Sequence, residues 1–197
     1  SNAEWNISYS TYDAVNFNGQ GSSDLNFGAY RTDKNFENAN FTQAHDIQIR
    51  DWATSSTITL TNATFKDATK LNLTIEAQII ALDADFTGAE IEGFGYQNTS
   101  TRTFAGSTFE GAHFVSSSSY WFRNVDLTNV SFLNATMARN DTGQNAFVGA
   151  ILVGTNFNGT NLSKVGFGDT DLSGVDFSNA NLTQAGFVAA DLTGVNF

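Results

Sequence analysis

Large apolar residues recur at every fifth position in the last third of the chain. From Leu127 to Phe197, a step of five residues meets Leu, Phe or Met at every position except Thr142. We call these residues the centres. The residue two positions before a centre is mostly small, the one just before it is often Asn or Asp, and Ser or Thr often follows. A period of five fits neither an α-helix nor a flat strand. It predicts a coil that turns a corner every five residues, with one large and one small side chain per side pointing inward.

This segment resembles the pentapeptide-repeat family, whose units read A(D/N)LXX. Residues 180–184 (ANLTQ) and 190–194 (ADLTG) match that unit directly, and more than ten consecutive units keep the spacing. The resemblance implies an all-β fold, a right-handed quadrilateral parallel β-helix with about four units per coil. Such a fold is a solenoid, in which each repeat packs only against its neighbours.

The order of the centres supports four sides independently. From Phe147 onward, Phe and Leu alternate without exception. If four units close one coil, residues 20 apart stack on one another, and each column holds one residue type. The predicted columns are Phe157, Phe177 and Phe197; Phe147, Phe167 and Phe187; Leu152, Leu172 and Leu192; and Leu162 and Leu182. We expect these side chains in the core and Asp126, Asp171 and Asp176 on the surface.

Upstream, the register survives in pieces such as Phe36 with Phe41, Leu60 with Phe65, and Ile75 with Ile80. We interpret the slips between pieces as loops at 18–24, 28–35, 50–57, 97–103 and 115–119, with a distortion at 138–144. Residues 4–197 are then one domain, degenerate and loop-bearing over 4–119 and regular over 120–197. A separate N-terminal β domain is the alternative. Residues 1–3 resemble an expression-tag remnant and are left out of the fold.

Composition excludes several classes of function. Nine Lys and Arg against 20 Asp and Glu give a net charge of -11, which argues against binding a nucleic-acid backbone. The chain has no Cys, so it has no disulfide or thiolate metal site. No apolar run approaches the ~18 residues of a membrane span. Scarce Lys with abundant Asn and Thr leaves the localisation open and favours export over the cytoplasm.

Candidate chemistry is sparse, and we predict no catalytic residue, cofactor or metal. The two histidines, His45 and His113, are not spaced as metal ligands. Residues 83–88 and 169–174 begin like calcium loops but lack the carboxylate at the twelfth position, and each contains a centre. Beside the 115–119 insertion, Tyr120 and Trp121 are expected to face outward as a partner surface. The alternative is that the serine-rich loop covers the indole.

These observations indicate a non-enzymatic structural or protein-interaction module with an unidentified protein partner. The alternative is an acidic rod that mimics DNA, because some family members protect DNA gyrase, a topoisomerase, in that way. Residues 1–97 hold 13 acids and 5 bases, whereas residues 98–197 hold 7 and 4. The most regular half is therefore the least charged, which weakens the mimic.

The repeat runs in register to Phe197 without a polar capping unit. We expect an uncovered end formed by Leu182, Phe187, Leu192 and Phe197. Either the sequence is truncated there, or two copies meet end to end through these residues as a weak homodimer, which we favour. The gyrase-protecting relatives dimerise through their C-terminal coils, so the resemblance implies the same contact.

Overall fold

A computed structural model describes residues 10–11, 25–26, 33–49, 56–73, 78–94, 102–115, 121–137 and 146–197. Within these ranges every regular element is a short β-strand. The strands are β1 (Ser10–Thr11), β2 (Leu25–Asn26), β3 (Lys34–Asn35), β4 (Ile47–Gln48), β5 (Thr57–Thr59), β6 (Leu71–Leu73), β7 (Gln78–Ile80), β8 (Glu90–Phe94), β9 (Arg102–Thr103), β10 (His113–Phe114) and β11 (Val125–Asp126).

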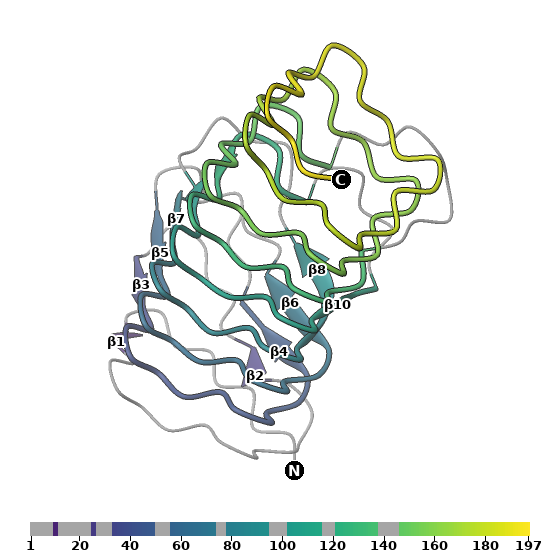
Figure 1. Ribbon diagram of the computed structural model, residues 1–197. Coiled ribbons are helices and arrows are strands. Elements are labelled where there is room, and N and C mark those ends of the chain that lie inside the picture. Colours follow the sequence, from purple (N-terminus) through teal and green to yellow (C-terminus); the bar gives the residue numbers. More distant parts are fainter. Residues whose placement is uncertain are drawn as a thin grey trace.

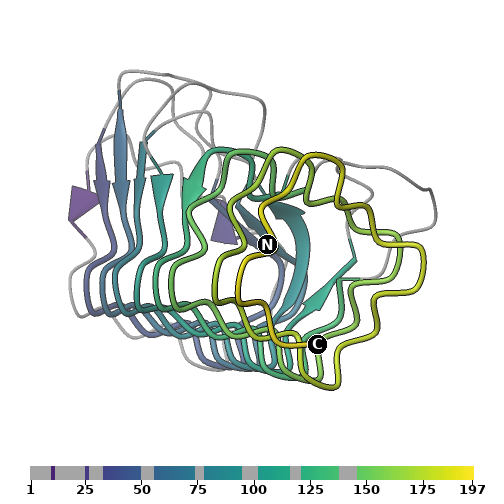
Figure 2. The same ribbon diagram turned by 45° about the horizontal axis from the view of Figure 1, so that its top comes forward.

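The strands form two parallel sheets that the chain visits in turn. One sheet has the order β1-β3-β5-β7-β9-β11, and the other has the order β10-β8-β6-β4-β2. Each strand pairs with the equivalent strand of the next coil, so the chain winds as a stack (Figure 1). Beyond β11 the parallel pairing continues as isolated bridges, from Asn156 through Asp176 to Asn196. Figure 2 shows these later coils lying on the earlier ones. The all-β solenoid expected from the sequence is confirmed.

Four columns of centres define four faces of the coil. Inter-coil hydrogen bonds establish the first and third faces, and ring stacking establishes the second and fourth. Leu152 shares the first face with Leu172 because the centres on either side of it, Phe147 and Phe157, stack on Phe167 and Phe177. The first face carries Phe36, Leu60, Ala81, Phe104, Leu127, Leu152, Leu172 and Leu192. The second carries Phe41, Phe65, Phe86, Phe109, Phe132, Phe157, Phe177 and Phe197. The third carries Phe114, Met137, Leu162 and Leu182. The fourth carries Phe122, Phe147, Phe167 and Phe187. The four predicted columns are therefore confirmed.

The eight phenylalanines of the second face form one continuous stack. Successive ring centroids are 4.6 to 6.0 Å apart, and the ring planes differ by 1° to 14°. That spacing is close to the ~4.8 Å between neighbouring strands, because each ring is carried by the next coil. Rings of the fourth face meet this stack edge to face, as Phe157 does Phe167 at 82°. The interior is thus filled with aromatic rings and leaves the small residues to close the gaps.

Polar residues also take the small inward position without leaving a hydroxyl unsatisfied. Ser107 donates to the carbonyl oxygen of Ala81 at 2.7 Å. Thr155 and Thr160 donate to the carbonyls of Leu127 and Phe132 at 2.9 and 2.7 Å. A buried hydroxyl costs free energy unless it is hydrogen-bonded, so these bonds make the position tolerant of Ser and Thr.

Each corner of the coil requires a left-handed backbone two residues after a centre. Asn129 has a φ of 58°, and Gly154, at the same corner one coil later, has a φ of 69°. A Cβ on Gly154 would overlap Oδ1 of Asn129, whereas a Cβ on Gly174 would meet nothing within 4 Å. Because the Asn129 side chain occupies the space that a Cβ would need, Gly is the residue that fits at position 154.

Several details expected from the sequence are wrong. Ile80 is only half-buried, and Ala81 takes the centre position because β7 pairs with β9 in a register one residue later. The loops at 28–35, 50–57 and 97–103 end earlier than predicted, since their last residues lie in β3, β5 and β9. Among the acids expected on the surface, Asp171 is exposed, but Asp126 and Asp176 are half-buried. Ile75, residues 18–24 and residues 138–144 lie outside the described residues.

Truncation within the phenylalanine stack gives the first test. Phe157→Ala should lower the free energy of unfolding by about 3–5 kcal/mol, because it removes a fully buried ring and leaves a cavity between two others. Phe197→Ala removes the last ring of the same stack, which is largely exposed, and should cost much less. Urea denaturation followed by circular dichroism measures both. Equal losses would show that stacking on both sides is not what stabilises the coil.

The corner geometry gives the second test. Gly154→Ala and Gly174→Ala both place a side chain at a left-handed backbone, which costs roughly 1–2 kcal/mol. Gly154→Ala should cost more, because the new methyl displaces the Asn129 side chain. In the Asn129→Ala background the two glycine variants should become equal. A double-mutant cycle by urea denaturation checks this, and an unchanged difference would contradict the proposed contact.

Candidate interaction site

The polar side chains that precede the centres are used in local turns. The backbone N–H of Ser173 donates to Oδ1 of Asp171 at 2.9 Å, and Ser178 and Thr193 make the same bond to Asp176 and Asp191. These are Asx turns, which Asn and Asp form readily. The rows of Asn and Asp on the surface therefore have a structural role, because their side chains stabilise the turns of the coil.

The same hydrogen bonds lower the pKa values of the surface carboxylates. Bonds from the side chain and the backbone of Ser173 lower the pKa of Asp171 below its usual range. Bonds from Ser178 and Thr193 likewise lower the pKa values of Asp176 and Asp191. A carboxylate that accepts hydrogen bonds is stabilised in its charged form. These surface acids therefore stay ionised at neutral and mildly acidic pH.

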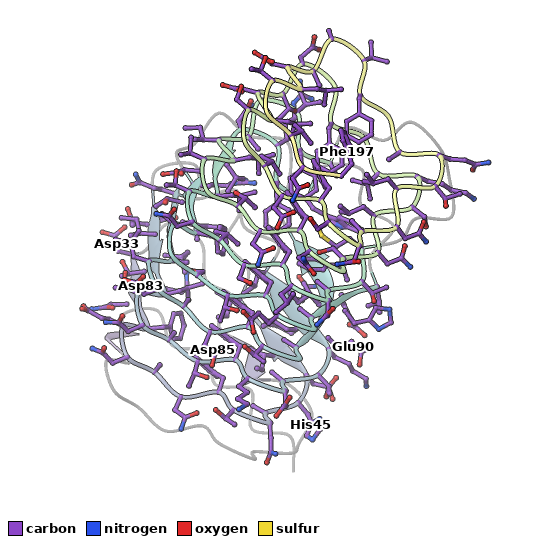
Figure 3. All side chains as sticks on the ribbon, viewed as in Figure 1. Asp33, His45, Asp83, Asp85, Glu90 and Phe197 are labelled. Atoms are coloured by element: carbon purple, nitrogen blue, oxygen red, sulfur yellow. The ribbon has the colours of Figure 1, made fainter. Side chains whose placement is uncertain are left out.

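The candidate chemical residues do not converge in the described ranges. His45 hydrogen-bonds through Nδ1 to Oγ1 of Thr69, and His113 is exposed beside Glu90 of the adjacent strand (Figure 3 labels His45 and Glu90). Asp85, from the first calcium-like stretch, accepts the N–H of Thr87 at 2.9 Å. Over the part of the chain that the structure describes, no three His, Asp or Glu side chains are grouped to hold a metal ion. The described residues also contain no helix long and apolar enough to cross a membrane.

The expectation that Trp121 faces outward is wrong. Its indole is fully buried, and its ring centroid lies 5.4 Å from that of Phe114. Phe122 is a centre, as expected, but the residue before it also points inward, as Ala146 does before Phe147. Both pairs directly follow residues outside the described ranges. Phe122 starts a new five-residue register eight residues after Phe114, whereas Phe147 keeps the register of Met137. A large apolar residue in the Asn/Asp position was the available signal. Tyr120 itself lies outside the described residues.

The predicted end residues do come together. We call residues 178–197 the end coil. One coil earlier, every centre donates its N–H to the end coil: Leu162 to Asn181, Phe167 to Gly186, Leu172 to Asp191 and Phe177 to Asn196, at 2.7 to 2.9 Å. Within the described residues, no further coil accepts the equivalent N–H groups of Leu182, Phe187, Leu192 and Phe197.

The end coil is apolar and almost uncharged. Phe197 is 65% exposed and Leu192 is 41% exposed, although the same positions one coil earlier are buried. Figure 3 shows the Phe197 ring at this end of the stack. Residues 178–197 contain one charged side chain, Asp191, in a chain of net charge -11. Within the residues that the structure describes, exposed apolar centres and little charge make the end coil a candidate for a protein contact.

A second exposed apolar site was not found from the sequence. Ile151 and Val153 flank the buried centre Leu152 and are 51% and 63% exposed. Ile151 stands where most units carry Asn, Asp or Thr. That departure from the repeat was the signal that sequence reasoning missed.

Two comparisons with known proteins find similarities, and a third finds none. A family described as Pentapeptide repeat region matches residues 120–197. Similar solved structures include HetL, a pentapeptide-repeat protein involved in heterocyst differentiation in the cyanobacterium Nostoc, at 16% identity, 94% of this chain, 88% of that chain and a TM-score of 0.23. Another is full-length QnrB1, a plasmid-mediated fluoroquinolone resistance protein, which is 15% identical over 92% of this chain and 90% of that chain, with a TM-score of 0.29. A search of curated proteins finds no match.

The lowered carboxylate pKa values generate a test of pH dependence. The folded pKa of Asp191 lies below its unfolded value, so its contribution to stability is present above the unfolded pKa of ~3.9 and is lost as pH falls through the folded pKa. Thr193→Val removes the hydroxyl that donates to Oδ1 at 2.6 Å and should raise the pKa of Asp191. Carboxyl titration by NMR measures this. Thr183→Val, next to the uncharged Asn181, should leave Asp191 unchanged. An unmoved pKa in Thr193→Val would contradict the assigned cause.

Proposed function

We propose that this chain, whose residues 120–197 belong to the pentapeptide-repeat family and whose earlier coils continue the same stack, is a non-enzymatic protein-interaction module. The end coil carries this proposal. It combines four N–H groups that have no acceptor among the described residues with exposed apolar centres. An open strand edge of this kind favours pairing with another chain.

A second copy of the chain is the occupant that this end fits. Each side of the end coil presents the N–H of a centre and the C=O two residues before it, as Phe197 and Val195 do. One coil earlier, the equivalent C=O of Val175 accepts the N–H of Asn196 at 3.1 Å. In an antiparallel pair, such an N–H meets the C=O of the other strand, and the reverse bond forms at the same time. The end coil is therefore complementary to itself under twofold symmetry.

Twofold pairing at this end is self-limiting and brings few charges into the contact. The contact uses the same patch on both copies, so it closes at a dimer. Two chains of charge -11 repel each other, but Asp191 is the only charged side chain of each end coil, and the α-carboxylate of the 197-residue chain adds one further charge. One four-sided end buries less than the ~800 Å² per partner of a standard interface. We therefore expect a homodimer of weak to moderate affinity.

Light scattering of the 197-residue chain over a range of concentrations tests the dimer. Phe197→Asp and Leu192→Asp should each give a monomer, because each places a carboxylate in the apolar contact. Val153→Asp adds the same charge to an exposed apolar site on the first face and should leave the dimer intact. A strict monomer at the highest concentration would sink the proposal, and so would a dimer indifferent to both end substitutions.

The alternative, an acidic rod that mimics DNA and binds a topoisomerase such as DNA gyrase, has the net charge in its favour. Duplex DNA carries one charge per ~1.7 Å of axis. The second half of the chain, residues 98–197, has a net charge of only -3, from 7 acids and 4 bases. A gyrase supercoiling assay distinguishes the two: inhibition that survives Phe197→Asp would favour the mimic over the proposed end contact.

A further inference from the structure

In one row of outward positions on the first face, two isoleucines stand where the repeat usually has a polar residue. The row is defined by parallel register, from Ile80 through Thr103 and Asp126 to Ile151. In equivalent positions around the coil, Asn or Asp side chains accept the N–H of the residue two positions later. They are Asn35, Asn40, Asp85, Asp126, Asn156, Asn161, Asp171, Asp176, Asn181 and Asp191. An isoleucine has no acceptor for that bond.

Ile151 replaces the usual polar residue of this position without becoming buried. Ile151 and Val153 stand outward on either side of the buried Leu152, and each leaves more than half of its surface exposed. Backbone bonds still fix this strand, since Ile151 donates to Val125 and accepts from Leu127. The apolar pair therefore gives up a local hydrogen bond while contributing little to the core. Residues that break a local rule without a gain in stability are expected at functional sites.

The apolar pair is bordered by carboxylates on its own face. Asp126 precedes Ile151 in the row. Asp171 takes the same position one coil later, in the 20-residue register that stacks Phe157 on Phe177, and Asp191 follows it. Hydrogen bonds from Ser173 and Thr193 keep the pKa values of Asp171 and Asp191 low, so both are charged at neutral pH. No Lys or Arg takes an outward position of this face within the described ranges.

We propose that Ile151 and Val153 form a docking surface for a protein segment that presents an apolar side chain between two Lys or Arg residues. Charge complementarity selects this occupant: Asp126 pairs with Ile151 at the ~4.8 Å strand spacing, and the repeat places Asp171 one coil after it on the same face. In an extended segment, side chains two residues apart share one face and are separated by roughly 6.7 Å. A Lys-x-Leu-x-Lys segment laid along the stack thus brings its Leu over Ile151 and Val153 and its ammonium groups toward Asp126 and Asp171.

This inference rests on the proposed role as an interaction module but not on the end-to-end contact. The surface lies on the side of the stack, and the dimer contact lies at its end. A monomeric Phe197→Asp variant should therefore bind the segment as the parent chain does. Loss of the dimer with binding retained, or the reverse, shows which of the two proposals fails.

The capped peptide TKTLTKT is the probe, titrated into the isotopically labelled 197-residue chain and followed by NMR. We expect the backbone amides of Ile151, Val153 and Asp171 to shift, and binding to weaken as salt is raised. The peptide TKTSTKT keeps the charge without the apolar side chain, and TETLTET keeps the apolar side chain with the opposite charge. Equal binding of TKTSTKT would overturn the proposal, since charge alone would explain the contact. So would an absence of shifts with TKTLTKT at the highest concentration.

Ile151→Asn is the decisive variant, because it restores the residue type that the repeat uses at this position. It should weaken TKTLTKT binding by roughly fivefold or more while leaving the urea midpoint unchanged or raised. Val188→Thr changes an apolar side chain that is 81% exposed on the fourth face and should leave binding unchanged. If Ile151→Asn destabilises the fold, or if it binds the peptide as the parent does, Ile151 has a structural role and the proposal is wrong.

Discussion

The stack of phenylalanine rings on the second face is the interaction on which the rest of the structure depends. Its eight members are separated by 20 to 25 residues, yet each ring lies directly on the last. Rings packed at the strand spacing tie side-chain packing to backbone pairing, because neither can shift without the other. The rings keep this stacking although successive coils differ in length by up to five residues.

A filled interior leaves the outer surface as the place where this protein can vary. Inward positions accept a large ring, a small aliphatic residue or a hydroxyl that finds a carbonyl, as Thr160 does. Outward positions are constrained mainly by the turn hydrogen bond, which Asp171 makes and Ile151 cannot make. The two candidate contacts use different chemical groups. The end coil offers backbone donors and exposed centres along the axis, whereas Ile151 and Val153 offer side chains on one flank.

These two contacts are compatible in one assembly. A twofold dimer through the end coils leaves the first face of each copy open, and symmetry gives the dimer two copies of the Ile151 surface. A partner with two basic-apolar segments could then engage both flanks, with an effective concentration set by the distance between its segments. Such a partner would bind the dimer more tightly than the monomer without any new contact.

The sequence by itself determined the coil, because the five-residue period and the Phe–Leu alternation are local patterns that leave one packing solution. It determined the four columns for the same reason. It did not determine the burial of Trp121, the centre role of Ala81 or the exposure of Ile151. The first two depend on where the register restarts after extra residues, and only pairing with the neighbouring coil fixes that. The repeat places Ile151 outward, but how much of it is exposed depends on the residues that adjoin it across coils, 20 to 25 positions away in the chain, so the tertiary structure decided the extent.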